Sequence, residues 1–181
     1  MDAPSPAAPT PSAPMSGLVY ADVPNRVIAI IIDGIILFLL LIVLGIILAA
    51  IGLATGAGAS AVASIVYAVL GLAVGAAYFI YTWTSMRATI GMRALGMQIG
   101  NAGDGKTLTM DQATRRWLVI ALPGILAQVL FVLPALGALI GLLAFGWFIY
   151  LLWTTYSSPT KQGFHDKYAN TMVVKAARSA G

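Results

Sequence analysis

The sequence contains no cysteine and no glutamate, and only 9% of its 181 residues are charged. The absence of cysteine excludes disulfides, thiolate metal sites and cysteine nucleophiles. The scarcity of charge excludes an ordinary soluble domain, because soluble domains carry about 25% charged residues. Sixty per cent of the residues are hydrophobic, and the mean hydropathy is +0.91. We therefore expect the lipid bilayer to be the main solvent of this chain.

Few residues could form a catalytic or metal site. His165 is the only histidine, and the sequence has no phosphate-binding glycine loop, catalytic triad or zinc spacing. We expect no enzyme activity and no cofactor, and the sequence does not indicate a metal. The net charge of +4 could suggest nucleic acid, but basic flanks beside apolar runs are typical of membrane proteins. We therefore expect no nucleic-acid partner.

Four apolar segments are predicted to cross the membrane as helices. About 20 apolar residues span a bilayer core of about 30 Å, and the segments 27–51 and 61–83 meet this length. No charge occurs from 117 to 153, but one helix of that length would extend about 55 Å, too far for a single crossing. Pro134 offers a break, which gives spans 117–133 and 135–153.

The lysines and arginines support four spans rather than three. With four spans, all ten basic residues face the same side of the membrane. With three, Lys161, Lys167, Lys175 and Arg178 would face outward, against the positive-inside bias. We predict a multi-pass protein of a cytoplasmic (inner) membrane, with both termini in the cytoplasm.

The segment between the second and third spans predicts a short β-hairpin. Segments 95–99 and 106–109 are β-prone, and the residues 101–105 between them are rich in the Asn, Asp and Gly that form turns. Segment 171–175 is also predicted as a strand, which could pair with 95–99 at the membrane surface. The expected fold class is an all-α integral membrane protein with four transmembrane helices and a short cytoplasmic β-hairpin or interfacial segment.

One membrane domain, 17–175, is predicted between two unstructured ends. The tail 1–16 is rich in proline and alanine, so we expect it to be disordered. Residues 176–181 are expected to fray.

Local signals mark the ends of two predicted helices. Thr109 and Gln112 have the spacing of a capping box, and Asp111 and Arg115, one turn apart, are expected to form a solvated pair. At the end of the second span, Tyr78, Tyr81 and Trp83 are clustered. This cluster predicts an interfacial aromatic belt, with a ligand cage as the alternative.

Asp33 is the only acid within a predicted span. It follows Arg26 by seven residues, so it lies on nearly the same helix face and about 10 Å deeper. A carboxylate at that depth is costly unless it is protonated, paired or hydrated. Two hypotheses stay open: a fixed ion pair that locks the bundle, or a site for a proton or cation. We expect the partner of Asp33 among Arg26, Arg115 and Arg116.

Three further polar residues are candidates for the site. Asp166 is expected to be the counter-charge of Arg26 or Arg115, or the cap of a turn. His165 is expected to be a hydrogen-bonded loop residue rather than a proton shuttle. Gln128 lies near the middle of the membrane, where an interhelical hydrogen bond is expected and a place on a transport pathway is the alternative.

Several motifs in order resemble the RDD family, mostly bacterial membrane proteins named for one arginine and two aspartates. The resemblance covers about residues 20–175 and rests on Arg26, Asp33, the stretch 89–97, the turn 105–109 before Arg115 and Arg116, and His165 with Asp166 before 170–174. Arg26 and Asp33 match the first two named positions, and we assign Asp166 to the third. The resemblance implies a bacterial membrane location. It also implies a link to transport, with cation/proton exchange in some members.

We therefore expect a small polytopic membrane protein that supports transport of a monovalent cation, a proton or a small solute, with Asp33 paired to Arg115 or Arg116. Four short spans are few for a complete transporter, so we expect a homo-oligomer or a subunit of a larger membrane assembly. The alternative is a structural or accessory subunit that transports nothing. In that case, Arg26, Asp33 and Asp166 form a fixed ion-pair lock.

Overall fold

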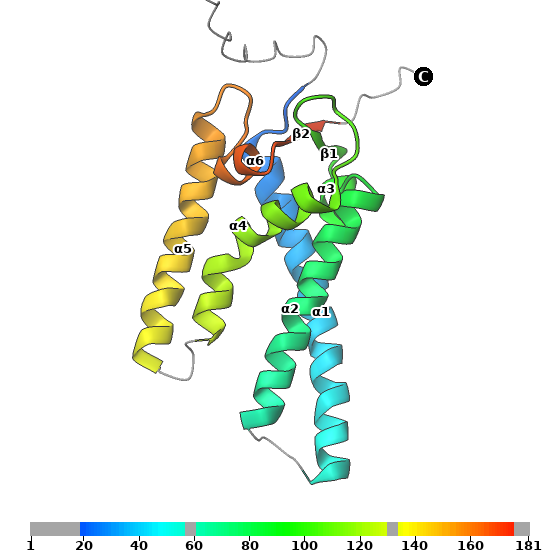
Figure 1. Ribbon diagram of the computed structural model, residues 1–181, viewed down its shortest axis with the longest axis vertical. Coiled ribbons are helices and arrows are strands. Elements are labelled where there is room, and N and C mark those ends of the chain that lie inside the picture. The colour runs from blue at the N-terminus through cyan, green and yellow to red at the C-terminus, as the bar shows by residue number, and fades with distance from the viewer. Residues whose placement is uncertain (1–18, 57–60, 130–133, 176–181) are drawn as a thin grey trace, which may run out of the picture.

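The computed structural model describes residues 19–56, 61–129 and 134–175 (Figure 1). The tail 1–16 and the end 176–181, for which we predicted disorder and fraying, lie outside these residues. The described elements are α1 (Val23–Thr55), α2 (Ala61–Ser85), α3 (Ile90–Ala94), β1 (Met97–Asn101), α4 (Met110–Val129), α5 (Pro134–Ser157), α6 (Phe164–Tyr168) and β2 (Thr171–Lys175).

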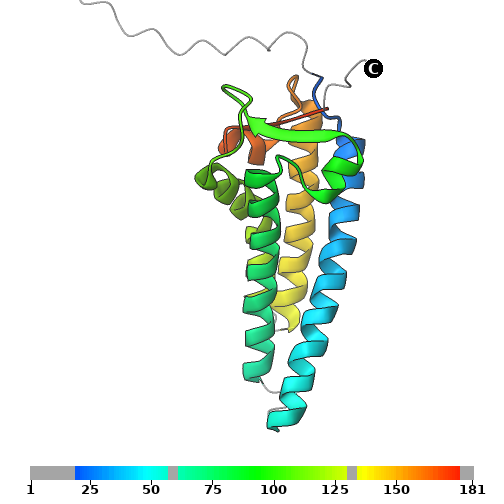
Figure 2. The ribbon, with the colours of Figure 1, turned by 90° about the vertical axis from the view of Figure 1, so that its right-hand side faces the viewer.

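The long helices α1, α2 and α5 run along the molecule, and the short elements gather at one end (Figures 1 and 2). Helix α1 packs against α2 and α3, and α4 packs against both α2 and α5. At the gathered end, β1 lies across the bundle, beside α3, α6 and β2 (Figure 2). We call this the polar end, because the site described below lies there.

Within the described residues, three helical segments are long and apolar enough to cross a membrane: Val23–Gly52, Val62–Ser85 and Ala138–Ser157. Large apolar side chains on them face outward; Ile35, Phe38 and Ile46, for example, are each more than half exposed. Such a surface is unfavourable in water and suits hydrocarbon, where a helix satisfies its own backbone hydrogen bonds. The chain therefore has the helices of a membrane protein.

Helix α4, which covers most of the predicted span 117–133, is not among these three segments. Its first turns carry Asp111, Arg115 and Arg116, and Pro123 lies inside it. An interior proline removes a backbone hydrogen bond and kinks a helix, and Figure 1 shows α4 first crossing the bundle and then turning along it. Residues 130–133 lie outside the described residues, so the number of four spans stays a prediction.

Strands β1 and β2 pair antiparallel, from Met97 opposite Lys175 to Asn101 opposite Thr171. The pairing of segment 171–175 with the first strand is therefore confirmed, although this strand lies at 97–101 rather than at the predicted 95–99. The hairpin between 95–99 and 106–109 is wrong, because 106–109 forms no strand.

The physical reason for this correction is the burial that β2 provides. Ile99 and Val173 face each other in the sheet and are almost completely buried, a gain that a short polar strand after the turn would not provide. The turn itself forms as expected, since Asn101 and Lys106 close it through a backbone hydrogen bond of 2.9 Å.

The segment before α1 pairs with the other edge of β2. Tyr20 forms a bridge with Val174, the Ala21 N–H donates to the Val173 carbonyl at 3.0 Å, and the Lys175 N–H donates to the Val19 carbonyl at 2.8 Å. The two ends of the described chain therefore meet at the polar end. This arrangement places the start of α1 beside the residues that follow α6.

The beginning of α4 confirms both local predictions. The Gln112 N–H donates to Thr109 Oγ1 at 3.2 Å, and the Thr109 N–H donates back to Gln112 Oε1 at 3.1 Å. Arg115 and Asp111 form an exposed ion pair at 2.9 Å. The capping box fixes where α4 begins. It therefore also fixes the direction of Arg116, the residue after Arg115, which points into the protein.

Candidate functional site

Asp166 lies at the centre of a buried charge cluster. It belongs to α6, has no exposed surface, and accepts hydrogen bonds from Arg26 of α1 at 2.8 Å and from Arg116 of α4. Thr171 of β2 completes the group, because Arg116 Nη1 also donates to Thr171 Oγ1 at 2.7 Å. We call Arg26, Arg116, Asp166 and Thr171 the Asp166 cluster. It joins four elements that are far apart in the sequence.

Backbone groups satisfy the remaining positions of this cluster. The Gly163 N–H donates to Asp166 Oδ2 at 3.0 Å, which caps α6. Arg26 donates through Nε to the Ala21 carbonyl at 3.2 Å and through Nη2 to the Lys161 carbonyl at 2.7 Å. All three nitrogens of the Arg26 guanidinium are therefore engaged. We predicted that Asp166 pairs with Arg26 or Arg115, or caps a turn; it pairs with Arg26 and caps α6, whereas Arg115 pairs with Asp111.

The charge of Asp166 is fixed by its neighbours. Burial opposes its ionisation, but the positive charges of Arg116 and Arg26 outweigh burial and hold the pKa of Asp166 well below its usual range. His165 behaves differently, since burial lowers the pKa of its imidazole to about 4 even though Asp166 acts in the opposite direction. At neutral pH, Asp166 is therefore charged and His165 is neutral.

Two glycines allow the close contacts that build the site. A side chain at Gly163 would collide with Thr155 Oγ1 of α5, so glycine lets α6 approach α5. A side chain at Gly91 would collide with the Ala29 carbonyl of α1. Glycine at this second position brings the start of α3 directly against α1.

Asp33 occupies a second buried position, on α1, with 3% of its surface exposed. Its Oδ1 accepts from the Tyr78 hydroxyl of α2 at 2.7 Å and from the Gly91 N–H at 2.8 Å. Its Oδ2 accepts from the Thr89 hydroxyl at 2.6 Å. A carboxylate that accepts from three donors satisfies most of its hydrogen-bonding capacity without an ion pair.

The arginine partner that we expected for Asp33 is not found. Among the residues that the structure describes, no salt bridge joins Asp33 to a basic side chain, because Arg26 and Arg116 both bind Asp166 and Arg115 binds Asp111 at the surface. Of the candidate charged residues, Arg26, Arg116 and Asp166 therefore lie together in one cluster. It leaves Arg115 outside that cluster.

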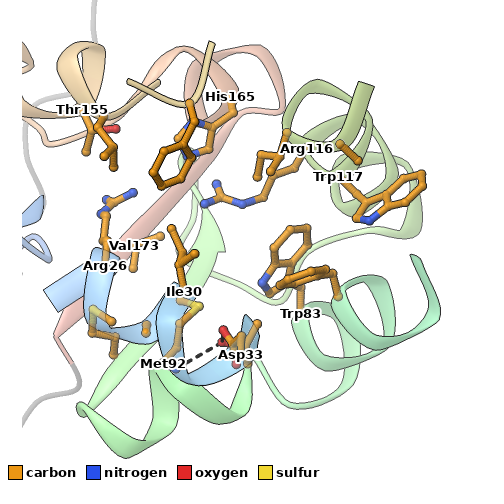
Figure 3. Close-up of a pocket in the computed structure, with 18 residues that line it drawn as sticks. Arg26, Ile30, Asp33, Trp83, Met92, Arg116, Trp117, Thr155, His165 and Val173 are labelled. Carbon is orange, nitrogen blue, oxygen red and sulfur yellow. Dashed lines mark hydrogen bonds between the residues drawn. The ribbon is translucent and has the colours of Figure 1, made fainter. Parts of the chain in front are cut away.

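One cavity of about 310 Å³ lies between Asp33 and the two arginines that bind Asp166. Asp33, Arg26, Arg116 and His165 all line it, among mainly apolar side chains. Figure 3 shows Arg26 and Arg116 entering this space from opposite sides, with His165 above the gap between them and Trp83 below Arg116. The cavity thus offers a small apolar space with charged groups in its wall.

Sequence reasoning missed the inward orientation of two aromatic residues. Tyr78 binds Asp33, and Trp83, with 4% of its surface exposed, lies under the Arg116 guanidinium at 5.1 Å from its ring centroid. Only Tyr81 of the predicted belt is exposed. In a helix that is apolar on every side, periodicity does not show which face is inside; the acid on the neighbouring span was the one available signal. Gln128 belongs to α4, but its side chain lies outside the described residues.

The comparison with protein families gives one match. A family model described as the RDD family matches residues 20–170. No curated protein and no solved structure matches the chain significantly. The matched segment contains Arg26, Asp33, Arg116 and Asp166, the acids and arginines that build the two buried sites. The chain belongs to the RDD family of membrane proteins.

Proposed function

We propose that this protein supports the transport of a cation, a proton or a small solute across a membrane, and that Asp33 is the group that exchanges a proton or binds the cation. The observation that carries the proposal is the position of Asp33 in the wall of the cavity, without an arginine partner in the described part of the chain. A buried acid of this kind in a membrane-spanning helix is a candidate for a functional site.

The partners of Asp33 suit a group that changes its protonation state. Two of them, Tyr78 and Thr89, are hydroxyls, which can donate to a carboxylate and can equally accept from a protonated carboxyl group. An arginine can only donate. A protonated Asp33 therefore has a neighbouring hydroxyl to which it can donate, whereas Asp166 lies between two arginines that hold it in its charged form.

We further propose four spans with both termini in the cytoplasm of a bacterium, in its cytoplasmic membrane. What supports an even number of crossings is the bridge between Tyr20 and Val174, which keeps the two ends of the described chain on the same side. Helix α4 would then lead away from the polar end and α5 back to it. We also propose a homo-oligomer or a larger assembly, because one chain is small for a transporter, and no enzymatic role.

A second candidate function is a structural or accessory subunit that transports nothing. The observation that favours it is the Asp166 cluster itself, which ties α1, α4 and β2 to α6 through buried charges. On this hypothesis the arginines and aspartates serve only to hold the membrane domain in one shape for a partner.

Vesicles reconstituted with the purified protein separate the two candidates. Proton flux driven by a Na⁺ or K⁺ gradient is measured for the wild type, for Asp33→Asn and for Asp111→Asn, an exposed acid on α4 that serves as the control. Transport predicts flux in the wild type and in Asp111→Asn, and none in Asp33→Asn. Flux that survives Asp33→Asn while thermal stability falls would favour the structural function. A wild type without cation-driven or solute-driven flux would end the transport proposal.

A further inference from the structure

We propose that the cavity at the polar end binds a small organic monoanion that has an apolar body, such as an aromatic carboxylate. This inference deepens the proposed transport function, on which it rests, by naming the class of solute that the site takes. It depends on the walls of the cavity, on hydrogen-bond donors that have no partner, and on the balance of charge around the space.

The walls select a small ligand with an apolar body. Aromatic and aliphatic side chains from α2, α4 and α5 form much of the lining, including Phe79, Ile120, Phe148 and Leu152. The volume of about 310 Å³ lies at the lower end of the range of about 300–1,000 Å³ found for ligand pockets. A ligand of few heavy atoms, without a long chain, fits these dimensions.

Two hydrogen-bond donors in this wall lack partners. Trp83 Nε1 and Arg116 Nε are both buried and make no hydrogen bond within the described part of the chain. The residues themselves are at least nine-tenths buried and line the cavity. A buried N–H without a partner is unfavourable, and such groups are rare in folded proteins. Neighbouring atoms cover both nitrogens, so a small shift of either side chain toward the cavity would bring its N–H to an oxygen acceptor there.

Arg116 is the residue with capacity to spare. Hydrogen bonds engage Nη1 of Arg116 but no other nitrogen of its guanidinium, as far as the described residues extend. Arg26 differs, because all three of its nitrogens are bound. A guanidinium edge with two N–H groups matches the two oxygens of a carboxylate. Arg116 therefore provides the charge that would recognise the ligand, and Trp83 beside it provides a further N–H and a flat apolar surface.

The charges beside the arginines argue against a cation at that end of the cavity. The oxygens of Asp166 already accept from both arginines and from Gly163, and a cation there would face two guanidinium groups in the wall. His165 Nδ1 also has no hydrogen-bond partner among the described residues. Because a neutral imidazole nitrogen can be a donor or an acceptor, this atom does not distinguish an anionic ligand from a cationic one.

Isothermal titration calorimetry on the full chain in lipid nanodiscs tests this proposal. Three probes share one apolar body and differ in charge: benzoate, benzyl alcohol and benzylammonium. Protein-free nanodiscs correct for partition into lipid. We expect benzoate to bind at least tenfold more tightly than either other probe. Trp83→Phe, which keeps an apolar ring and removes the N–H, should weaken benzoate binding about tenfold or more, the effect of losing a hydrogen bond to a charged group. Trp153→Phe, a change at an exposed tryptophan of α5, should leave it unchanged.

A second variant keeps the test decisive if Trp83→Phe does not fold. Ala121 lines the cavity, and Ala121→Leu fills part of the space without removing a polar group, so it should abolish benzoate binding at unchanged thermal stability. Equal affinity for the three probes would overturn the proposal, as would a preference for benzylammonium. Benzoate binding without any flux would refute the transport function and leave this site standing. Flux without benzoate binding would refute this binding site and leave the transport function standing.

Discussion

The Asp166 cluster predicts a large and specific loss of stability for Asp166→Asn. The substitution leaves Arg26 and Arg116 buried without their counter-charge, and breaking a buried ion pair costs about 3–5 kcal/mol. The side chain at position 166 is fully buried, so solvent cannot replace the lost interaction. For a domain of this size, each kcal/mol lowers the melting temperature by roughly 2–4 °C. We therefore expect a decrease of about 6–20 °C.

Thermal unfolding of the purified protein in one detergent measures this decrease. The control is Asp111→Asn, which breaks the exposed pair with Arg115 and should cost less than about 1 kcal/mol. A double variant with Arg116→Gln adds a second test, because residues that share one network are not additive: the arginine substitution should cost less in the Asp166→Asn background than in the wild type. If Asp166→Asn melts within about 2 °C of Asp111→Asn, the cluster does not hold the polar end together.

Three further substitutions or conditions probe the neighbouring groups. Acidification from pH 7 to pH 4.5 should lower the melting temperature, because the folded protein keeps the pKa of His165 near 4 while the unfolded value is about 6.5. The unfolded chain therefore binds the extra proton, and the loss of stability is about 2.4 kcal/mol. His165→Gln should flatten this part of the pH profile. Tyr78→Phe removes one donor from Asp33 and should cost about 1–2 kcal/mol in thermal unfolding, and an unchanged melting temperature would show that this bond contributes nothing. Gly91→Ala should destabilise the protein by about 2 kcal/mol or more, because its Cβ collides with α1. The control is Gly75→Ala on α2, where a Cβ meets nothing within 4 Å and the change should be neutral within about 0.5 kcal/mol. Equal melting temperatures of the two variants would refute the close contact between α3 and α1.

Several parts of the fold followed from the sequence because their causes are local. The length and apolar character of α1, α2 and α5 are properties of continuous segments, so hydropathy alone identified them. The capping box of Thr109 and Gln112 depends on residues three apart and was also predictable. The strand 171–175 was recognised from its composition, and its pairing with the predicted strand 95–99 was proposed from the sequence.

The buried sites depended on contacts that no local pattern encodes. Asp166 meets Arg26 and Arg116 across 140 and 50 positions of the sequence, so each charge could be recognised as needing a partner but the choice among partners could not be made. The assignment of an arginine to Asp33 failed for this reason. Two hydroxyls and a backbone N–H satisfy that acid instead, and none of these groups differs in sequence from ordinary polar residues near a helix end.

The central claim is that Asp33 gains and loses a proton during transport, whereas Asp166 stays charged. Proton flux into reconstituted vesicles, measured for the wild type and for Asp33→Asn at matched protein content, tests it most directly, with the melting temperature of each protein recorded in parallel. The account predicts that Asp33→Asn loses the flux and keeps a melting temperature within a few degrees of the wild type, because Asn still accepts from Tyr78 and Gly91. Full flux in Asp33→Asn would contradict it.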